Sequence, residues 1–159
     1  MKKTITITLI IALISCIFLS IPVSATTADN TERTIEYLDN GDYIETIITD
    51  DTANPGISLY ATNTITKTKT RYYKNSSGTV LWSVAIKATF SYNGSTSTCT
   101  SCSHITTAPA SAWSIKSALH SKSGNTATAK ATATWKTSAE SKDYSMSVTI
   151  KCSATGVVS

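Results

Sequence analysis

The chain has 159 residues, of which 41% are hydrophobic and 15% are charged, and its formal net charge is +4. Without a leader at residues 1–25, 134 residues remain, which is the length of one domain with its own core. The sequence has no glycine-rich phosphate loop, HExxH or GxSxG, the motifs of common enzyme classes. We therefore predict a noncatalytic protein that needs no cofactor.

Residues 1–25 have the layout of a secretory signal peptide. Lys2 and Lys3 precede an apolar run that ends at Pro22 and at a small-residue segment closing on Ala25. This order predicts cleavage after Ala25 and a secreted, extracellular or cell-surface protein. Two alternatives are an uncleaved membrane anchor and a lipoprotein in which Cys16 is lipidated. The run stays apolar beyond Cys16, which favours simple cleavage.

Charge is distributed unevenly along the remaining chain. Residues 26–61 contain eight acids and one base, a net of −7, whereas residues 62–159 contain eleven Lys and Arg and two acids, a net of +9. A Pro-Gly turn at 55–56 lies between the two regions. We predict an acidic segment at 26–61 and a basic domain at 62–159. The segment either packs on the domain, is a removable pro-segment that masks it, or is an exposed linker.

The acidic segment has the pattern of a β-hairpin. Residues 34–39 and 42–49 flank an Asn-Gly pair at 40–41, the strongest short signal for a hairpin with a two-residue loop. That loop would place Glu36 opposite Glu45, an unfavourable pair of like charges. We therefore expect cations of the basic domain to lie at these two carboxylates.

The basic domain shows strand periodicity. Residues 80–92 alternate apolar and polar side chains, three later segments repeat the pattern, and residues 64–73 alternate more weakly. The predicted inward residues are Val80, Trp82, Val84, Ile86, Ala88, Phe90 and Tyr92; Trp113, Ile115, Ser117 and Leu119; Ala127, Ala129, Ala131, Ala133 and Trp135; and Tyr144, Met146, Val148, Ile150 and Cys152. Turn residues at 75–78, 93–94 and 123–125 separate the segments.

One-sided alternation is typical of antiparallel sheets that pack against each other. The sequence predicts an all-β fold, an antiparallel β-sandwich of about six to eight strands, immunoglobulin-like or similar, preceded by the hairpin. A partly open β-barrel is the second choice. Trp82, Trp113 and Trp135 fall in register with apolar positions, so we expect them in the core rather than stacked on a sugar ligand.

Three cysteines remain after export. In an oxidising compartment we predict a disulfide between Cys99 and Cys152, which would close a loop of about 50 residues and stabilise the fold by roughly 4 kcal/mol. Cys102 is left over, and its CxxC spacing with Cys99 lacks the helix that redox motifs use. These two cysteines with His104 and His120 do not match a recognised zinc spacing, so we predict no metal site and histidines in loops.

Basic residues alternate along one predicted strand. Lys67, Lys69 and Arg71 lie on one side of it, where they would form a ladder for an anionic polymer such as wall teichoic acid, nucleic acid or phospholipid headgroups. Such binding is electrostatic and carries no nucleotide sequence specificity. The alternative is a lysine-guarded edge strand that resists aggregation.

Three stretches resemble small exported proteins of Gram-positive bacteria that have no assigned function. They are GDYIET at 41–46, VLWSV at 80–84 with FSYNG at 90–94, and WSI at 113–115. The resemblance implies export and a β-rich fold, and it transfers no activity. We predict a binding module for anionic cell-wall polymers or the cell surface. The alternative is a cationic antimicrobial or toxin-like protein held by an acidic pro-segment, with a mature form that begins near Thr62.

Overall fold

The computed structural model describes residues 32–51 and 62–159, and these form eight strands and the turns between them. The strands are β1 (Glu32–Tyr37), β2 (Tyr43–Asp50), β3 (Asn63–Lys74), β4 (Val80–Tyr92), β5 (Ser97–Thr107), β6 (Trp113–Ser123), β7 (Thr126–Lys136) and β8 (Ser141–Lys151). The predicted signal peptide, Cys16 and the turn at 55–56 lie outside the described residues. In the described part of the chain, no helix has the length and apolarity needed to cross a membrane.

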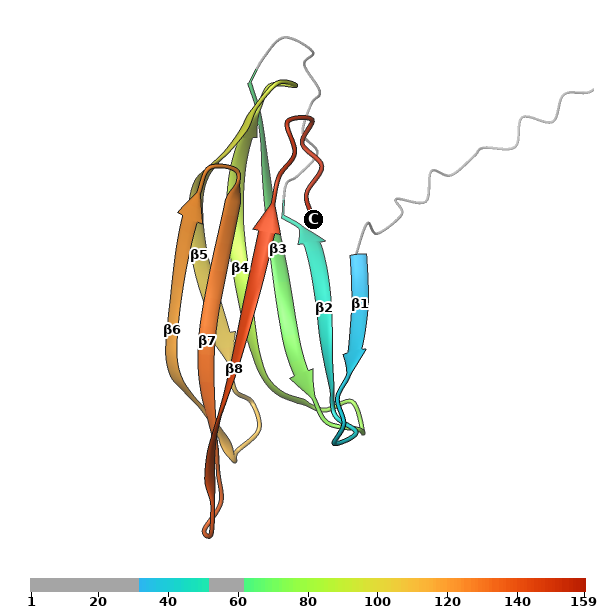
Figure 1. The fold of residues 1–159 in the computed structure, drawn as a ribbon, viewed down its shortest axis with the longest axis vertical. Coiled ribbons are helices and arrows are strands. Elements are labelled where there is room, and N and C mark those ends of the chain that lie inside the picture. The colour runs from blue at the N-terminus through green and yellow to red at the C-terminus, as the bar shows by residue number, and fades with distance from the viewer. Residues whose placement is uncertain (1–31, 52–61) are drawn as a thin grey trace, which may run out of the picture.

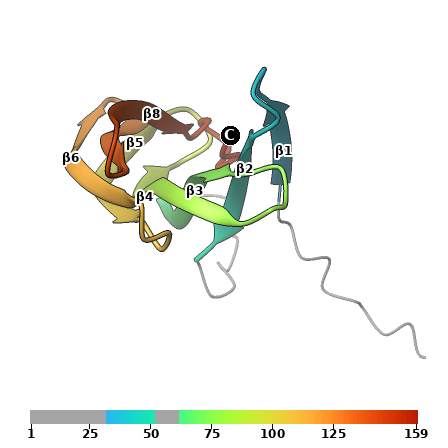
Figure 2. The ribbon, with the colours of Figure 1, turned by 90° about the horizontal axis from the view of Figure 1, so that it is seen from below.

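Two antiparallel sheets pack face to face, as Figure 1 shows. The larger sheet has the order β1-β2-β3-β4-β5 and the smaller has the order β6-β7-β8, so the chain changes sheet once, between β5 and β6. Strands β3, β4 and β5 contact the smaller sheet, whereas β1 and β2 extend beyond it (Figure 2). The prediction of an all-β antiparallel sandwich is confirmed.

The core lies where the central strands of both sheets face each other. Trp82 and Phe90 of β4 have no exposed surface, and they belong to one cluster with the apolar residues of β7 and β8. Alanines at 127, 129, 131 and 133 form the inner face of β7 and are all buried. Because these side chains are small, the large residues of β4 find space between the sheets. Trp113 and Trp135 are only partly buried.

The hairpin register differs from the prediction by one residue. The N–H of Leu38 donates to the carbonyl of Asp42 and the N–H of Gly41 donates to the carbonyl of Leu38, so the loop has three residues rather than two. Gly41 has a φ of 84°, the left-handed conformation that such a loop requires. Glu36 therefore lies opposite Ile44 instead of Glu45. The two carboxylates point to opposite faces of the sheet.

The predicted inward face of β6 is wrong beyond its first residues. The register shifts between Ile115 and Ser117, so that Lys116 is an extra residue relative to β7. This β-bulge turns Leu119 outward, with 56% of its surface exposed, while Ala118 packs against the core.

Strand β5 was not predicted. Its sequence is almost entirely Ser, Thr, Cys and His, and a bulge opposite Thr89 and Phe90 breaks its alternation. His104 lies on β5 and His120 on β6, so the prediction that both histidines are in loops is wrong.

Candidate functional site

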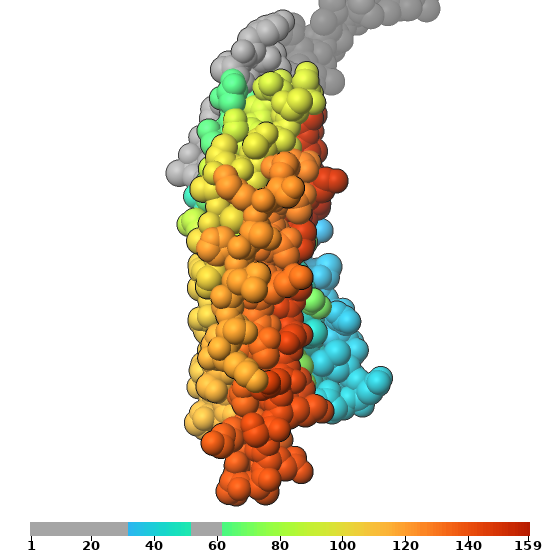
Figure 3. All heavy atoms as spheres, turned by 60° about the vertical axis from the view of Figure 1, so that its left-hand side comes forward, coloured from blue at the N-terminus to red at the C-terminus, as the bar shows by residue number. Residues whose placement is uncertain are grey.

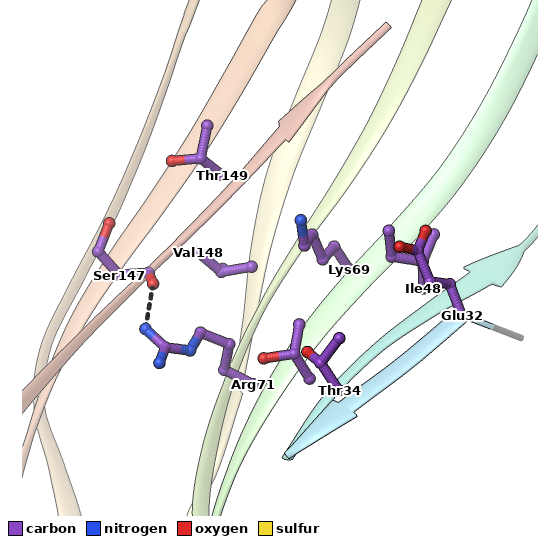
Figure 4. Close-up of a pocket in the computed structure, with 9 residues that line it drawn as sticks. Glu32, Thr34, Ile48, Lys69, Arg71, Ser147, Val148 and Thr149 are labelled. Atoms are coloured by element: carbon purple, nitrogen blue, oxygen red, sulfur yellow. Dashed lines mark hydrogen bonds between the residues drawn. The ribbon is translucent and has the colours of Figure 1, made fainter. Parts of the chain in front are cut away.

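A polar groove opens where the larger sheet extends beyond the smaller one. Its volume is about 350 Å³, and it lies between the inner face of β1, β2 and β3 and the edge strand β8 (Figure 4). The lining residues are Glu32, Thr34, Thr46, Ile48, Lys69, Arg71, Ser147, Val148 and Thr149. Within residues 32–51 and 62–159, the smaller sheet has three strands and none of them covers β1 and β2, which leaves the groove open.

The predicted basic ladder faces this groove. Lys67, Lys69 and Arg71 lie on the same face of β3 as Ile65 and Tyr73, which are buried in the core. They therefore point toward the smaller sheet at its open side. Strand β3 lies between β2 and β4, so the alternative of a guarded edge strand is wrong.

Two of the three cations already have anionic partners. The ammonium of Lys67 lies 2.9 Å from a carboxylate oxygen of Asp50. The guanidinium of Arg71 lies 3.0 Å from a carboxylate oxygen of Glu36. Arg71 also donates a hydrogen bond of 3.1 Å to the carbonyl of Ser147, which spans the groove in Figure 4. Lys69 has no carboxylate partner among the residues that the structure describes. Among the described residues, it is the groove cation without an ion-pair partner.

On the opposite face of the hairpin, Glu45 is an almost fully buried carboxylate. Its side chain is 4% exposed and forms ion pairs with Lys74 of β3 and Arg33 of β1. The hydrogen bond from Lys74 is the main cause that holds the pKa of Glu45 below its usual range, and the charges of Lys74 and Arg33 add to it, against the opposing effect of burial.

One more contact between residues 32–51 and the basic region lies just after the end of β2. A carboxylate oxygen of Asp51 lies 3.1 Å from the ammonium of Lys87 and accepts a hydrogen bond of 2.6 Å from Thr68. Four carboxylates of residues 32–51 thus pair with four cations of the basic region. Cations do lie at Glu36 and Glu45, as expected, although the two acids do not face each other.

The three cysteines are free thiols in this structure. Cys99 and Cys152 belong to the same buried cluster. The N–H of Cys99 donates to the carbonyl of Gly124, and the N–H of Cys152 donates to the carbonyl of Asn125, the next residue in the chain. The disulfide between Cys99 and Cys152 stays a prediction. Burial raises the pKa of both thiols, and the nearby Cys102 further raises the pKa of Cys99. A raised pKa disfavours the thiolate that redox catalysis needs.

The two histidines meet on the side of the sandwich away from the groove. The Nδ1 atoms of His104 and His120 are 2.7 Å apart, and the ring centroids are 4.9 Å apart. Within residues 32–51 and 62–159, no three or more His, Cys, Asp or Glu side chains are grouped so that they could hold a metal ion. Sequence reasoning missed this pair because β5 was not recognised as a strand beside β6.

Fold and groove together define a two-sheet antiparallel β-sandwich with a cation-lined opening at one side. Comparisons with protein-family models, with curated proteins and with solved structures find no match for this chain.

Proposed function

We propose that this is a noncatalytic β-sandwich protein, secreted or held at the cell surface, that binds anionic surface polymers through the groove beside β8. The observation that carries the proposal is the ammonium of Lys69, which lines the groove and has no carboxylate partner among the described residues. A free cation in a partly enclosed polar site attracts an anion more strongly than a cation on an open surface.

Most of the other groove residues suit a phosphate or carboxylate group, and the exception is the carboxylate of Glu32. Thr34, Thr46 and Thr149 supply hydroxyl groups that can donate hydrogen bonds, and Arg71 adds a guanidinium that is shared with Glu36. A groove of about 350 Å³ accommodates one charged unit of a polymer at a time. We therefore expect weak, repetitive and salt-sensitive binding rather than recognition of one small molecule.

Lys69→Gln tests the proposal. Binding of the exported protein to purified cell walls is measured by sedimentation at about 50 mM and about 200 mM salt, and wild-type binding should fall steeply over this range. In the variant, the slope of log affinity against log salt should decrease by about one, because one cation no longer releases a counterion.

Lys130→Gln is the matched control for this experiment. Lys130 is an exposed residue of β7 outside the cation-lined groove, and its substitution changes the net charge by the same amount. Equal losses in the two variants would show that net charge alone drives binding. Wild-type binding that does not depend on salt would contradict the electrostatic mechanism.

Four ion pairs join residues 32–51 to the basic region, and they favour a second candidate function. This candidate is a cationic antimicrobial or toxin-like protein that an acidic pro-segment holds inactive. Removal of the chain before Thr62 would free Lys67, Arg71, Lys74 and Lys87 together. This candidate predicts an exported form that begins near Thr62, and intact mass spectrometry measures it. A mature protein that begins after Ala25 and is never shortened further would contradict this candidate. The same mass distinguishes cleavage after Ala25 from lipidation of Cys16.

A further inference from the structure

His104 and His120 are the only histidines in the sequence, and the fold brings them together from different sheets. On β5, His104 lies opposite the fully buried Ile86, and on β6, His120 lies opposite the buried Ala129. Both histidines therefore lie on the inward faces of their strands, at the edge of the sandwich where β5 and β6 meet, with His104 partly buried and His120 exposed. Figure 3 brings this side of the molecule forward.

The two Nδ1 atoms face each other across a short distance. At 2.7 Å, one nitrogen donates a hydrogen bond to the lone pair of the other. A bound ion would take the place of this shared proton once the rings turn so that both lone pairs point at it. Metal to imidazole distances are about 2.0–2.1 Å, so two ligand nitrogens lie about 2.9 Å apart at a right angle and about 3.3 Å apart at a tetrahedral angle. The two nitrogens therefore need to separate by only about 0.2–0.6 Å to bind one ion, and imidazole is a good ligand for Ni²⁺, Cu²⁺ and Zn²⁺ alike.

We propose that His104 and His120 form a surface site for a divalent transition ion that favours imidazole ligands, such as Ni²⁺, Cu²⁺ or Zn²⁺. The ion binds the two Nδ1 atoms and completes its coordination with water. The nearest cation along β6, Lys122, has its ammonium held at β5 by the carbonyls of Cys99 and Thr100, at 3.2 and 2.5 Å. Because the ligands come from β5 and β6, the bound ion would link the two sheets at the edge away from the groove.

Calorimetric titration of the full-length exported protein with NiCl₂, in a buffer that does not chelate metals, tests the site. Ni²⁺ is the probe because, unlike Cu²⁺, it does not oxidise the free thiols. We expect one ion per chain and a higher melting temperature when the ion is present. His104→Gln and His120→Gln should each abolish both effects. Failure of the wild type to bind, or retained binding in either variant, would overturn the proposal.

Two control variants separate the site from its surroundings. Ser121→Ala changes the residue next to His120 on the opposite face of β6 and should leave Ni²⁺ affinity unchanged. Cys102→Ser should also leave it unchanged, and a loss would overturn the assignment of two protein ligands. Melting curves without metal show whether each variant is folded.

Discussion

Phe90→Ala is expected to lower the free energy of unfolding by about 3–5 kcal/mol. Phe90 has no exposed surface and lies in the central strand β4, where it packs among residues of both sheets. Truncation removes most of a large side chain, and the rigid strands around it cannot fully close the cavity. Urea denaturation followed by tryptophan fluorescence measures the change.

Leu119→Ala is the control for the core prediction. Leu119 belongs to the apolar alternation of the sequence, but the bulge at Lys116 leaves 56% of its surface exposed. Its truncation should change the free energy of unfolding by less than about 0.5 kcal/mol. A loss comparable to that of Phe90→Ala would mean that β6 has no bulge and that Leu119 points into the core.

Glu45→Gln should destabilise the protein by roughly 2 kcal/mol at neutral pH. The substitution leaves Lys74, 17% exposed, without its anionic partner. We expect less than the cost of breaking a fully buried ion pair, because the second partner, Arg33, is 55% exposed and returns to water. Denaturation of wild type and variant under the same conditions measures the difference.

The effect of Glu45→Gln should depend on pH in a defined direction. The pKa of Glu45 is lowered in the folded protein, so its contribution is complete above the ordinary glutamate value of about 4.3 and is lost as the pH falls through the lower folded value. The difference between wild type and variant should therefore vanish in strong acid. A difference that stays constant down to acid pH would contradict the ion-pair explanation.

Glu36→Gln is the matched control on the opposite face of the hairpin. Glu36 is 64% exposed and also pairs with a cation of β3, Arg71. An exposed pair of this kind contributes less than about 1 kcal/mol. If the two substitutions had equal effects, burial of Glu45 would not be the reason for its importance.

The sequence predicts the core where alternation is uninterrupted. Strands β4, β7 and β8 carry their large or small apolar residues at every second position, and the structure buries the central residues of all three. Prediction fails where one extra residue is inserted. The third loop residue of the hairpin and the bulge at Lys116 each shift the pairing by one, and a strand exposes the opposite face after such a shift.

The candidate sites, like the core, could be predicted only where the alternation of residues is regular. The alternation of Lys67, Lys69 and Arg71 is visible in the sequence, and the structure confirms that they share one face. The sequence does not predict which of these cations form ion pairs. Asp50 and Glu36 lie beside them because of the way β1, β2 and β3 are aligned, and this register is visible only in the structure. The pairing of the histidines was beyond prediction for another reason. Strand β5 has almost no apolar residues that would distinguish it from a loop.

The hairpin has one more consequence, for self-association. Strand β2 pairs with β3 over eight consecutive register positions, from Tyr43 opposite Lys74 to Asp50 opposite Lys67. Any event that detaches the hairpin turns β3 from an internal strand into a long edge whose backbone donors and acceptors are bare. Such an edge recruits a strand from another copy of the chain and starts fibrous or amorphous polymers. The acidic hairpin therefore also guards the basic sheet against edge-to-edge aggregation.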